Sequence, residues 1–137
     1  AVLPAYPDSW LRRMAEVIPG FPFSMDLAGL LIGLFGAAFS IWAIVHLRAS
    51  FGLRTAVREL VTTGPYRRIR HPLYFGEIIH IFGVAILAAT PAALYLFGVA
   101  VALQAVRAKI EERKFLATVP EYEAFQRNTG FLWPRLF

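Results

Sequence analysis

The sequence contains no cysteine, which excludes disulfide bonds, zinc sites with thiolate ligands and catalysis by a cysteine nucleophile. It is also poor in charge: 17% of its 137 residues are Asp, Glu, Lys or Arg, whereas 58% are hydrophobic. The mean hydropathy of +0.56 lies well outside the usual balance for a soluble domain. These proportions argue against an ordinary cytosolic enzyme and favour a membrane protein.

The charges that are present have a formal excess of +5, which by itself would suggest a nucleic-acid partner. Here, however, the cations flank apolar stretches, where Lys and Arg commonly set membrane topology or bind anionic lipid headgroups. Twelve of the fourteen Lys and Arg residues follow the first or the third apolar stretch. This bias predicts a C-terminus in the cytoplasm and no nucleic-acid partner.

Three apolar stretches predict three transmembrane helices. The first, 27–47, has 21 residues without a formal charge, and a helix of that length spans roughly 31 Å. The second apolar region contains Thr90 and Pro91 near its middle, which predicts a tight hairpin of two helices over about 73–89 and 92–106. Helices of about 16 residues span only about 24 Å, so this hairpin should barely cross the bilayer.

The predicted fold class is therefore an all-α integral membrane protein with a single span, a tight hairpin, cytoplasmic amphipathic segments and a C-terminal lid. Residues 1–25 are expected to lie as an amphipathic segment in the membrane interface on the side away from the cytoplasm, because apolar residues recur there near helical spacing. Residues 26–137 are expected to form one domain. Beyond the third span the helix should continue unbroken to Thr118, and the aromatic tail after Pro120 should fold back as the lid.

Small residues mark one face of the first predicted span. They are Gly29, Gly33, Gly36, Ala37 and Ser40. Such a stripe predicts a close helix contact. Packing within the chain is the favoured interpretation, and packing against a second chain is the alternative.

The linker into the second span contains Arg67, Arg68 and Arg70, followed by His71 and Pro72. Proline suits the first position of a helix, and the free N–H groups of that first turn would form an anion site beside the arginines. Alternatively, the arginines are topological anchors and the proline only starts the helix.

Two ionisable side chains lie inside the predicted second span. Glu77 would lie near the edge of the hydrocarbon and His80 one turn deeper, where such groups are costly unless they pair or line a cavity. Arg107 and Glu111 are four residues apart and would share one helix face just above the membrane. All four residues are functional candidates, with a snorkelling acid, a hydrogen-bonded histidine and a solvated ion pair as the alternatives.

Four motifs occur in order in the second half of the chain. They are Gly-Pro-Tyr at 64–66, Arg-His-Pro-Leu-Tyr-Phe-Gly-Glu at 70–77, Arg-x-x-x-Glu-Glu at 107–112 and Pro-Glu-Tyr-x-x-Phe at 120–125. Together they resemble the isoprenylcysteine carboxyl methyltransferase family, including its bacterial and phospholipid methyltransferase relatives. The resemblance covers roughly residues 58–137 and implies a membrane methyltransferase that uses S-adenosylmethionine without a soluble Rossmann domain.

The resemblance also implies roles for individual residues. The S-adenosylmethionine pocket would be lined by Leu60, Val61, Tyr66, His71, Pro72, Leu73, Tyr74, Glu77 and Glu111. Arg107 would face the substrate, and Arg107 and Glu111 would be the catalytic residues. Glu112 is a nearby acid without an assigned role, and no metal is expected.

The implied reaction is methyl transfer, most simply to a carboxylate oxygen, on an apolar or amphipathic acceptor from the bilayer. A prenylcysteine carboxylate, a lipid amine and a small thiol are all acceptors of this kind. Family members typically have five or more spans against the three predicted here, so part of the usual cavity would be absent or supplied by another chain. The competing hypothesis is therefore a non-catalytic subunit of a larger membrane complex, and a homo-oligomer stays open as well.

Overall fold

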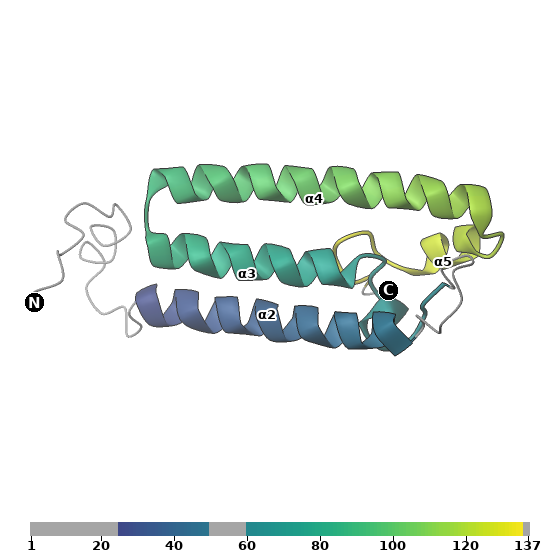
Figure 1. The fold of residues 1–137 in the computed structure, drawn as a ribbon, viewed down its shortest axis with the longest axis horizontal. Helices are drawn as coiled ribbons and strands as arrows, with labels where there is room; N and C mark the ends of the chain where they lie inside the picture. The colour runs from purple at the N-terminus through teal and green to yellow at the C-terminus, as the bar shows by residue number, and fades with distance from the viewer. Residues whose placement is uncertain (1–24, 50–59, 136–137) are drawn as a thin grey trace, which may run out of the picture.

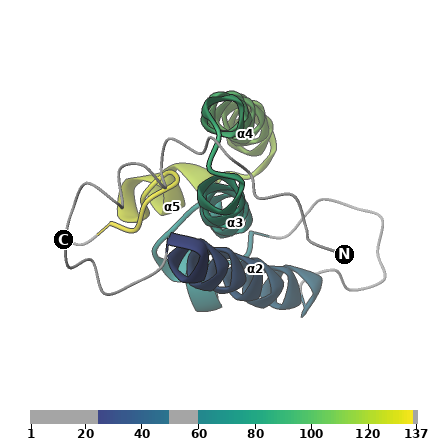
Figure 2. The ribbon, with the colours of Figure 1, turned by 90° about the vertical axis from the view of Figure 1, so that its left-hand side faces the viewer.

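The computed structural model describes residues 25–49 and 60–135, and the regular structure in these ranges is helical. Its elements are α2 (Met25–Ala49), the 3-10 turn η1 (Gly64–Arg67), α3 (Pro72–Ala88), α4 (Pro91–Thr118) and α5 (Tyr122–Asn128). The three long helices lie side by side with α3 in the middle, as both the side view (Figure 1) and the end view (Figure 2) show. The interfacial segment predicted over 1–25 lies outside the described residues apart from Met25.

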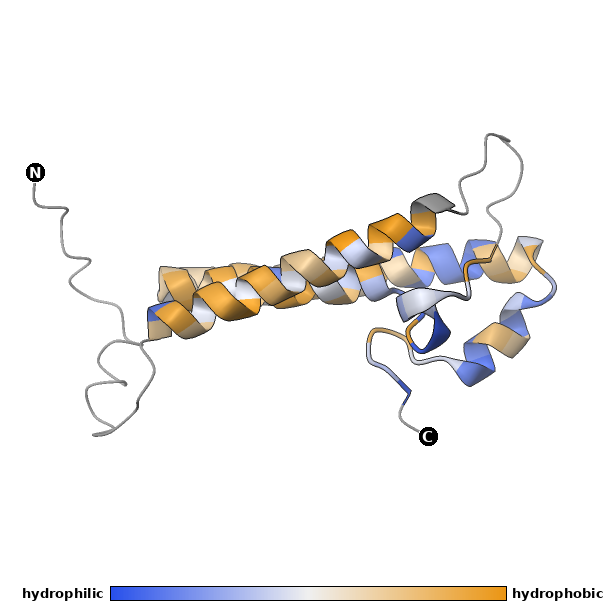
Figure 3. Cartoon of the chain, turned by 90° about the horizontal axis from the view of Figure 1, so that it is seen from below, coloured by the Kyte–Doolittle hydropathy of each residue, from blue (hydrophilic) through white to orange (hydrophobic). Residues whose placement is uncertain are grey.

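Two of these helices are long and apolar enough to cross a membrane, namely Met25–Leu47 of α2 and the whole of α4. The apolar α3 has only 17 residues, or about 26 Å of helix. The all-helical fold is thus confirmed, whereas the number of spans stays a prediction. Apolar residues run along all three helices and polar residues gather at one end (Figure 3). Large apolar side chains such as Leu34 (58% exposed) and Tyr95 (73% exposed) face outward, as lipid contact requires.

The turn between α3 and α4 falls where Thr90 and Pro91 predicted it. Ala89 ends α3 in the left-handed conformation, with a φ of 51°, and donates its N–H to the carbonyl oxygen of Ala85. Thr90 caps α4, because its hydroxyl oxygen accepts a hydrogen bond from the N–H of Ala93 at 3.1 Å. Pro91 occupies the first turn of α4, which then continues without a break to Thr118, as predicted.

Glycines let α2 and α3 approach each other backbone to backbone. A Cβ atom added at Gly36 would lie 2.7 Å from the carbonyl oxygen of Gly76, and one added at Gly83 would lie 2.6 Å from the carbonyl oxygen of Gly29. Both separations are shorter than real Cβ atoms show, so only glycine fits at these positions. The small-residue stripe on α2 therefore packs within the chain, against α3.

The tail after α5 folds back onto the linker that precedes α3. The N–H of Arg70 donates to the carbonyl oxygen of Gly130 at 2.8 Å, and the N–H of His71 donates to that of Phe131 at 3.3 Å. These backbone contacts place α5 and the tail at the polar end of the helical layer (Figures 1 and 3).

Candidate functional site

A cavity of about 270 Å³ lies at the polar end, where the linker, α3, α4 and α5 meet. Its volume is just below the roughly 300–1,000 Å³ usual for small-molecule sites. It is lined by Leu47, Leu60, Val61, Tyr66, Arg70, His71, Leu73, Tyr74, Glu77, Arg107, Glu111, Phe115, Tyr122 and Phe125. Apolar and aromatic walls with a few polar groups are the composition expected for a site that binds a small organic molecule.

The cavity gathers nine of the ten residues to which the resemblance gave a role. The exception is Pro72, which is fully buried at the start of α3 and does not line the cavity. The lining also includes residues that had no assigned role: Leu47, Arg70, Phe115, Tyr122 and Phe125. The Pro-Glu-Tyr-x-x-Phe motif contained the last two, but it predicted a lid and not a wall of this cavity.

Tyr74 stands between the two charged residues of α4 that spacing alone would pair. Its hydroxyl donates a hydrogen bond to Glu111 Oε1 at 2.5 Å, and the guanidinium carbon of Arg107 lies 5.1 Å from the centre of its ring. Arg107 makes no ion pair with any residue in the described part of the chain. Its N–H groups therefore keep their capacity to bind an anionic group in or near the cavity.

Glu77 faces the cavity from further along α3. Its carboxylate accepts a hydrogen bond from Nε2 of Gln104 on α4, whose Oε1 is buried without a hydrogen-bond partner among the described residues. Pairing and a cavity position are two conditions under which an acid is tolerated at membrane depth. His80 instead faces α2, where its Nδ1 lies 2.9 Å from the carbonyl oxygen of Gly33. This contact matches the hydrogen-bonded alternative for His80.

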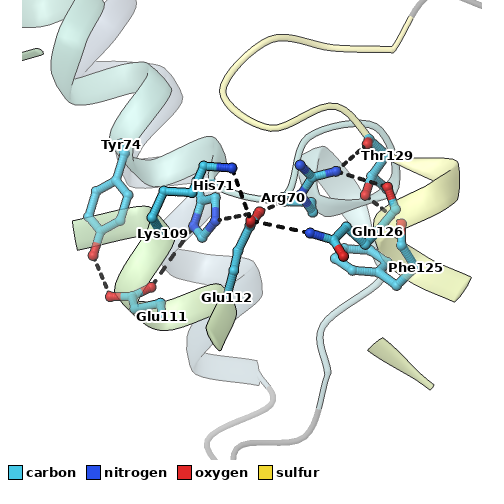
Figure 4. A network of polar contacts seen from close by, with 9 residues as sticks. All are labelled: Arg70, His71, Tyr74, Lys109, Glu111, Glu112, Phe125, Gln126 and Thr129. Atoms are coloured by element: carbon cyan, nitrogen blue, oxygen red, sulfur yellow. Dashed lines mark hydrogen bonds and ion pairs between the residues drawn. The ribbon is translucent and has the colours of Figure 1, made fainter. Parts of the chain in front are cut away.

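Glu112 lies at the centre of a polar network beside the cavity (Figure 4). Its side chain is 4% exposed, and Oε1 accepts a hydrogen bond from Arg70 Nε at 2.5 Å and lies 3.3 Å from His71 Nε2. Its Oε2 accepts a hydrogen bond from Gln126 Nε2 at 3.3 Å and lies 3.7 Å from Lys109 Nζ. One carboxylate thus connects α4 with the linker and with α5.

Arg70 completes this connection from the linker side. Besides its bond to Glu112, it donates to the backbone carbonyl oxygens of Gln126 at 2.9 Å and Thr129 at 2.6 Å. The side chains of Arg67 and Arg68, by contrast, are exposed. Of the three arginines considered as an anion site or as anchors, Arg70 is therefore committed to partners within the chain.

Burial changes the proton affinity of side chains at this end, His71 and Tyr122 among them. It lowers the pKa of His71 below 6.5, and the nearby Glu112 carboxylate opposes this effect only in part. His71 is therefore neutral at pH 7, with one ring nitrogen protonated and the other free to accept a hydrogen bond. Burial likewise raises the pKa of Tyr122 to about 12, so its hydroxyl keeps its proton.

No group of three or more His, Asp or Glu side chains within residues 25–49 and 60–135 is arranged to hold a metal ion. The polar groups of the cavity are instead two carboxylates, two arginines, tyrosine hydroxyls and one imidazole. Such a set is suited to binding an organic molecule that carries charges of both signs.

Residues 24–121 match the sequence profile of the family described as phospholipid methyltransferase. The chain belongs to the phospholipid methyltransferase family. The matched range includes every residue that lines the cavity except Tyr122 and Phe125. This finding confirms the resemblance deduced from the motifs, since that family is related to the isoprenylcysteine carboxyl methyltransferases.

Two curated proteins are similar to the chain. The cobalt-zinc-cadmium resistance protein CzcN of Cupriavidus metallidurans is 29% identical over 112 residues, covering 78% of this chain and 50% of CzcN. The nickel-cobalt-cadmium resistance protein NccN of Alcaligenes xylosoxydans xylosoxydans is 30% identical over 118 residues, covering 82% of this chain and 53% of NccN. The chain therefore spans about half the length of these relatives. No solved structure matches the chain.

Proposed function

We propose that this protein is a membrane methyltransferase that uses S-adenosylmethionine and modifies an apolar or amphipathic acceptor taken from the bilayer. The observation that carries the proposal is the cavity at the polar end. It brings together His71 from the linker, Tyr74 from α3, and Arg107 and Glu111 from α4, all within the range that matches the family.

The cavity wall fits the chemistry of S-adenosylmethionine, which combines a sulfonium, an ammonium, a carboxylate and a purine. The carboxylates of Glu77 and Glu111 face the cavity and suit the cationic groups, because attraction between charges is stronger in a partly apolar site than in water. The rings of Tyr66 and Tyr74 offer aromatic surface to the purine. The bound cofactor would supply an electrophilic methyl group on sulfur.

The chain itself would position the acceptor and exclude water, which are the main requirements of an in-line methyl transfer. A carboxylate acceptor is already nucleophilic at neutral pH, and the free N–H groups of Arg107 could hold it in a fixed orientation. Tyr74 supports this role because its hydroxyl donates a hydrogen bond to Glu111, the acid nearest to Arg107 along the helix, in place of an ion pair with Arg107. Phe115 and Phe125, which also line the cavity, would help to exclude water from it.

These roles favour a carboxylate acceptor such as a prenylcysteine, with a lipid amine and a small thiol as the other acceptors to be tested. The excess of cations after the first and third apolar stretches supports a cavity that opens toward the cytoplasm. The acceptor would then enter from the apolar side and the cofactor from the water side.

Calorimetric titration of the detergent-solubilised protein with S-adenosylmethionine and S-adenosylhomocysteine tests the cofactor site. We expect saturable binding that is lost in Glu111→Gln. The matched control is Glu123→Gln, which removes an acid of an exposed ion pair with Arg127 on α5 and should leave binding unchanged. Absence of binding by a folded, monodisperse wild-type sample would contradict the proposal and favour the non-catalytic membrane subunit.

A transfer assay with a radiolabelled methyl group tests the acceptor. Wild-type protein is offered a prenylcysteine, a phospholipid amine and a small thiol in separate reactions. Arg107→Ala should keep cofactor binding and lose transfer to the carboxylate. Full transfer by this variant would rule out the orienting role of Arg107, and transfer only to an amine or a thiol would overturn the choice of acceptor.

A further inference from the structure

The imidazole of His71 lies between two carboxylates at unequal distances. Its Nε2 is 3.3 Å from Glu112 Oε1, whereas its Nδ1 is 3.9 Å from Glu111 Oε2. The second distance is too long for a hydrogen bond. The ring is held in this orientation by Tyr74, stacked at 5.7 Å between ring centres, and by Phe131, which meets it at an angle of 80°.

The partners of Glu112 determine which of the two atoms in the shorter contact carries the proton. Arg70 has only donors and Gln126 presents its amide nitrogen, so Glu112 accepts a hydrogen bond from each of them, and the cationic Lys109 Nζ lies 3.7 Å from its Oε2. A carboxylate already held in this way accepts from His71 as well, which requires the proton on Nε2. Four ionisable groups face the His71 ring, namely Arg70, Tyr74, Glu111 and Glu112. Of the two acids, only Glu112 lies at hydrogen-bonding distance.

We propose that Glu112 is a positioning residue, which fixes the proton of His71 on Nε2 and so leaves Nδ1 as a hydrogen-bond acceptor. Two acceptors, Nδ1 of His71 and Oε2 of Glu111, then stand 3.9 Å apart beside the cavity. This arrangement suits a ligand group that brings N–H donors, such as an ammonium or an amino group. The choice of S-adenosylhomocysteine as the probe ligand rests on the proposed function, whereas the position of the proton is a property of the protein alone.

Nitrogen-15 NMR of the solubilised protein, labelled on its histidine rings, measures the position of that proton. The sequence has three histidines with two ring nitrogens each, so three pairs of ring signals are expected, and the pair lost in His71→Asn belongs to His71. At pH 7 we expect neutral His71 with the proton on Nε2. A proton on Nδ1, or a doubly protonated ring, overturns the proposal without any other variant being needed.

Glu112→Gln tests whether the acid sets this state. The glutamine amide can donate to Nε2, so we expect the proton to move to Nδ1 in part or completely. The affinity for S-adenosylhomocysteine should fall about tenfold, which corresponds to one hydrogen bond to a charged group. Glu123→Gln is the matched control and should change neither the ring signal nor the affinity.

The outcomes separate the two proposals. An unchanged His71 signal in folded Glu112→Gln overturns the positioning role even if the wild-type protein binds the cofactor product. A wild-type proton on Nε2 that moves in Glu112→Gln, in a protein that does not bind S-adenosylhomocysteine, supports the positioning role and contradicts the proposed function. If Glu112→Gln does not fold, the wild-type signal decides.

Discussion

The two ends of the helical layer are held together by opposite means. Along the apolar part, α2 and α3 meet backbone to backbone at glycines such as Gly36 and Gly76, where the fit depends on the absence of side chains. At the polar end, Arg70 and Glu112 join elements far apart in the sequence through a buried ion pair. In lipid there is little hydrophobic drive between helices, so close packing must hold the first region. The apolar part should therefore be sensitive to added volume, and the polar end to lost charge.

The largest effect should come from adding one methyl group to the apolar contact. Gly36→Ala would place its Cβ 2.7 Å from the carbonyl oxygen of Gly76 and 2.8 Å from the Cα of His80, and neither backbone can yield without separating the helices. We expect loss of folded, monodisperse protein, measured by size exclusion and thermal unfolding in detergent. Gly98→Ala is the matched control, because a Cβ there meets nothing within 4 Å. Equal melting temperatures in the two variants would refute this account of the contact.

The next largest effect should come from removing a charge at the polar end. Arg70→Ala leaves Glu112 buried without its closest partner, a change that typically costs about 3–5 kcal/mol. Hydrogen exchange over residues 122–135 should become faster, because Arg70 also binds the carbonyl oxygens of Gln126 and Thr129. Arg127→Ala breaks an exposed ion pair and should cost less than about 1 kcal/mol. Similar exchange rates in both variants would show that the buried pair does not hold the tail.

A smaller effect should follow from pH, and it belongs to the polar end alone. Because burial lowers the pKa of His71, the unfolded chain binds more protons on this residue than the folded chain does between that lowered value and pH 6.5. Its contribution to stability is therefore complete above pH 6.5 and declines as the pH falls through this window, by about 1.4 kcal/mol for each unit of pKa difference. In a plot of melting temperature against pH from 5 to 8, His71→Asn should flatten the part below pH 6.5. A wild-type slope that persists in the variant would assign the effect to other groups.

The smallest effect should come from the hairpin tip, which tests whether the apolar part contains a polar contact that matters. Thr90→Ala removes the hydroxyl that accepts from the N–H of Ala93 and should cost about 1 kcal/mol. Thr90→Ser keeps the cap and should melt close to the wild type. A loss in the serine variant as large as in the alanine variant would mean that the methyl group of Thr90, and not its hydroxyl, stabilises the turn.

Local signals in the sequence predict much of this structure. Pro91 marks the turn, Pro72 marks the start of α3, and the apolar and charged stretch up to Thr118 predicts one helix. These features are predictable because each depends on the conformational limits of a few neighbouring residues. The motifs of the resemblance, in turn, named most of the residues that line the cavity.

The polar network could not be predicted in the same way. Arg70 looks like the third member of a basic run, and its partner Glu112 lies 42 residues further along the chain. Which acid it meets depends on where α5 and the tail fold back, and no local spacing encodes that position. The ion pair between Arg107 and Glu111, which was the alternative to a functional role, does not form, because Tyr74 from another helix contacts both side chains.

Because α4 runs unbroken from Pro91 to Thr118, the hairpin tip fixes the direction in which the side chains of Arg107 and Glu111 point. Each residue of an α-helix advances the chain by about 100° of rotation and 1.5 Å of length. One residue inserted between the tip and Arg107 would swing Arg107 and Glu111 by about 100° away from Tyr74. The number of residues from Pro91 to Arg107 therefore determines whether Arg107 and Glu111 face the cavity. Insertions in this stretch should disrupt the site far more than insertions of the same size in the tail.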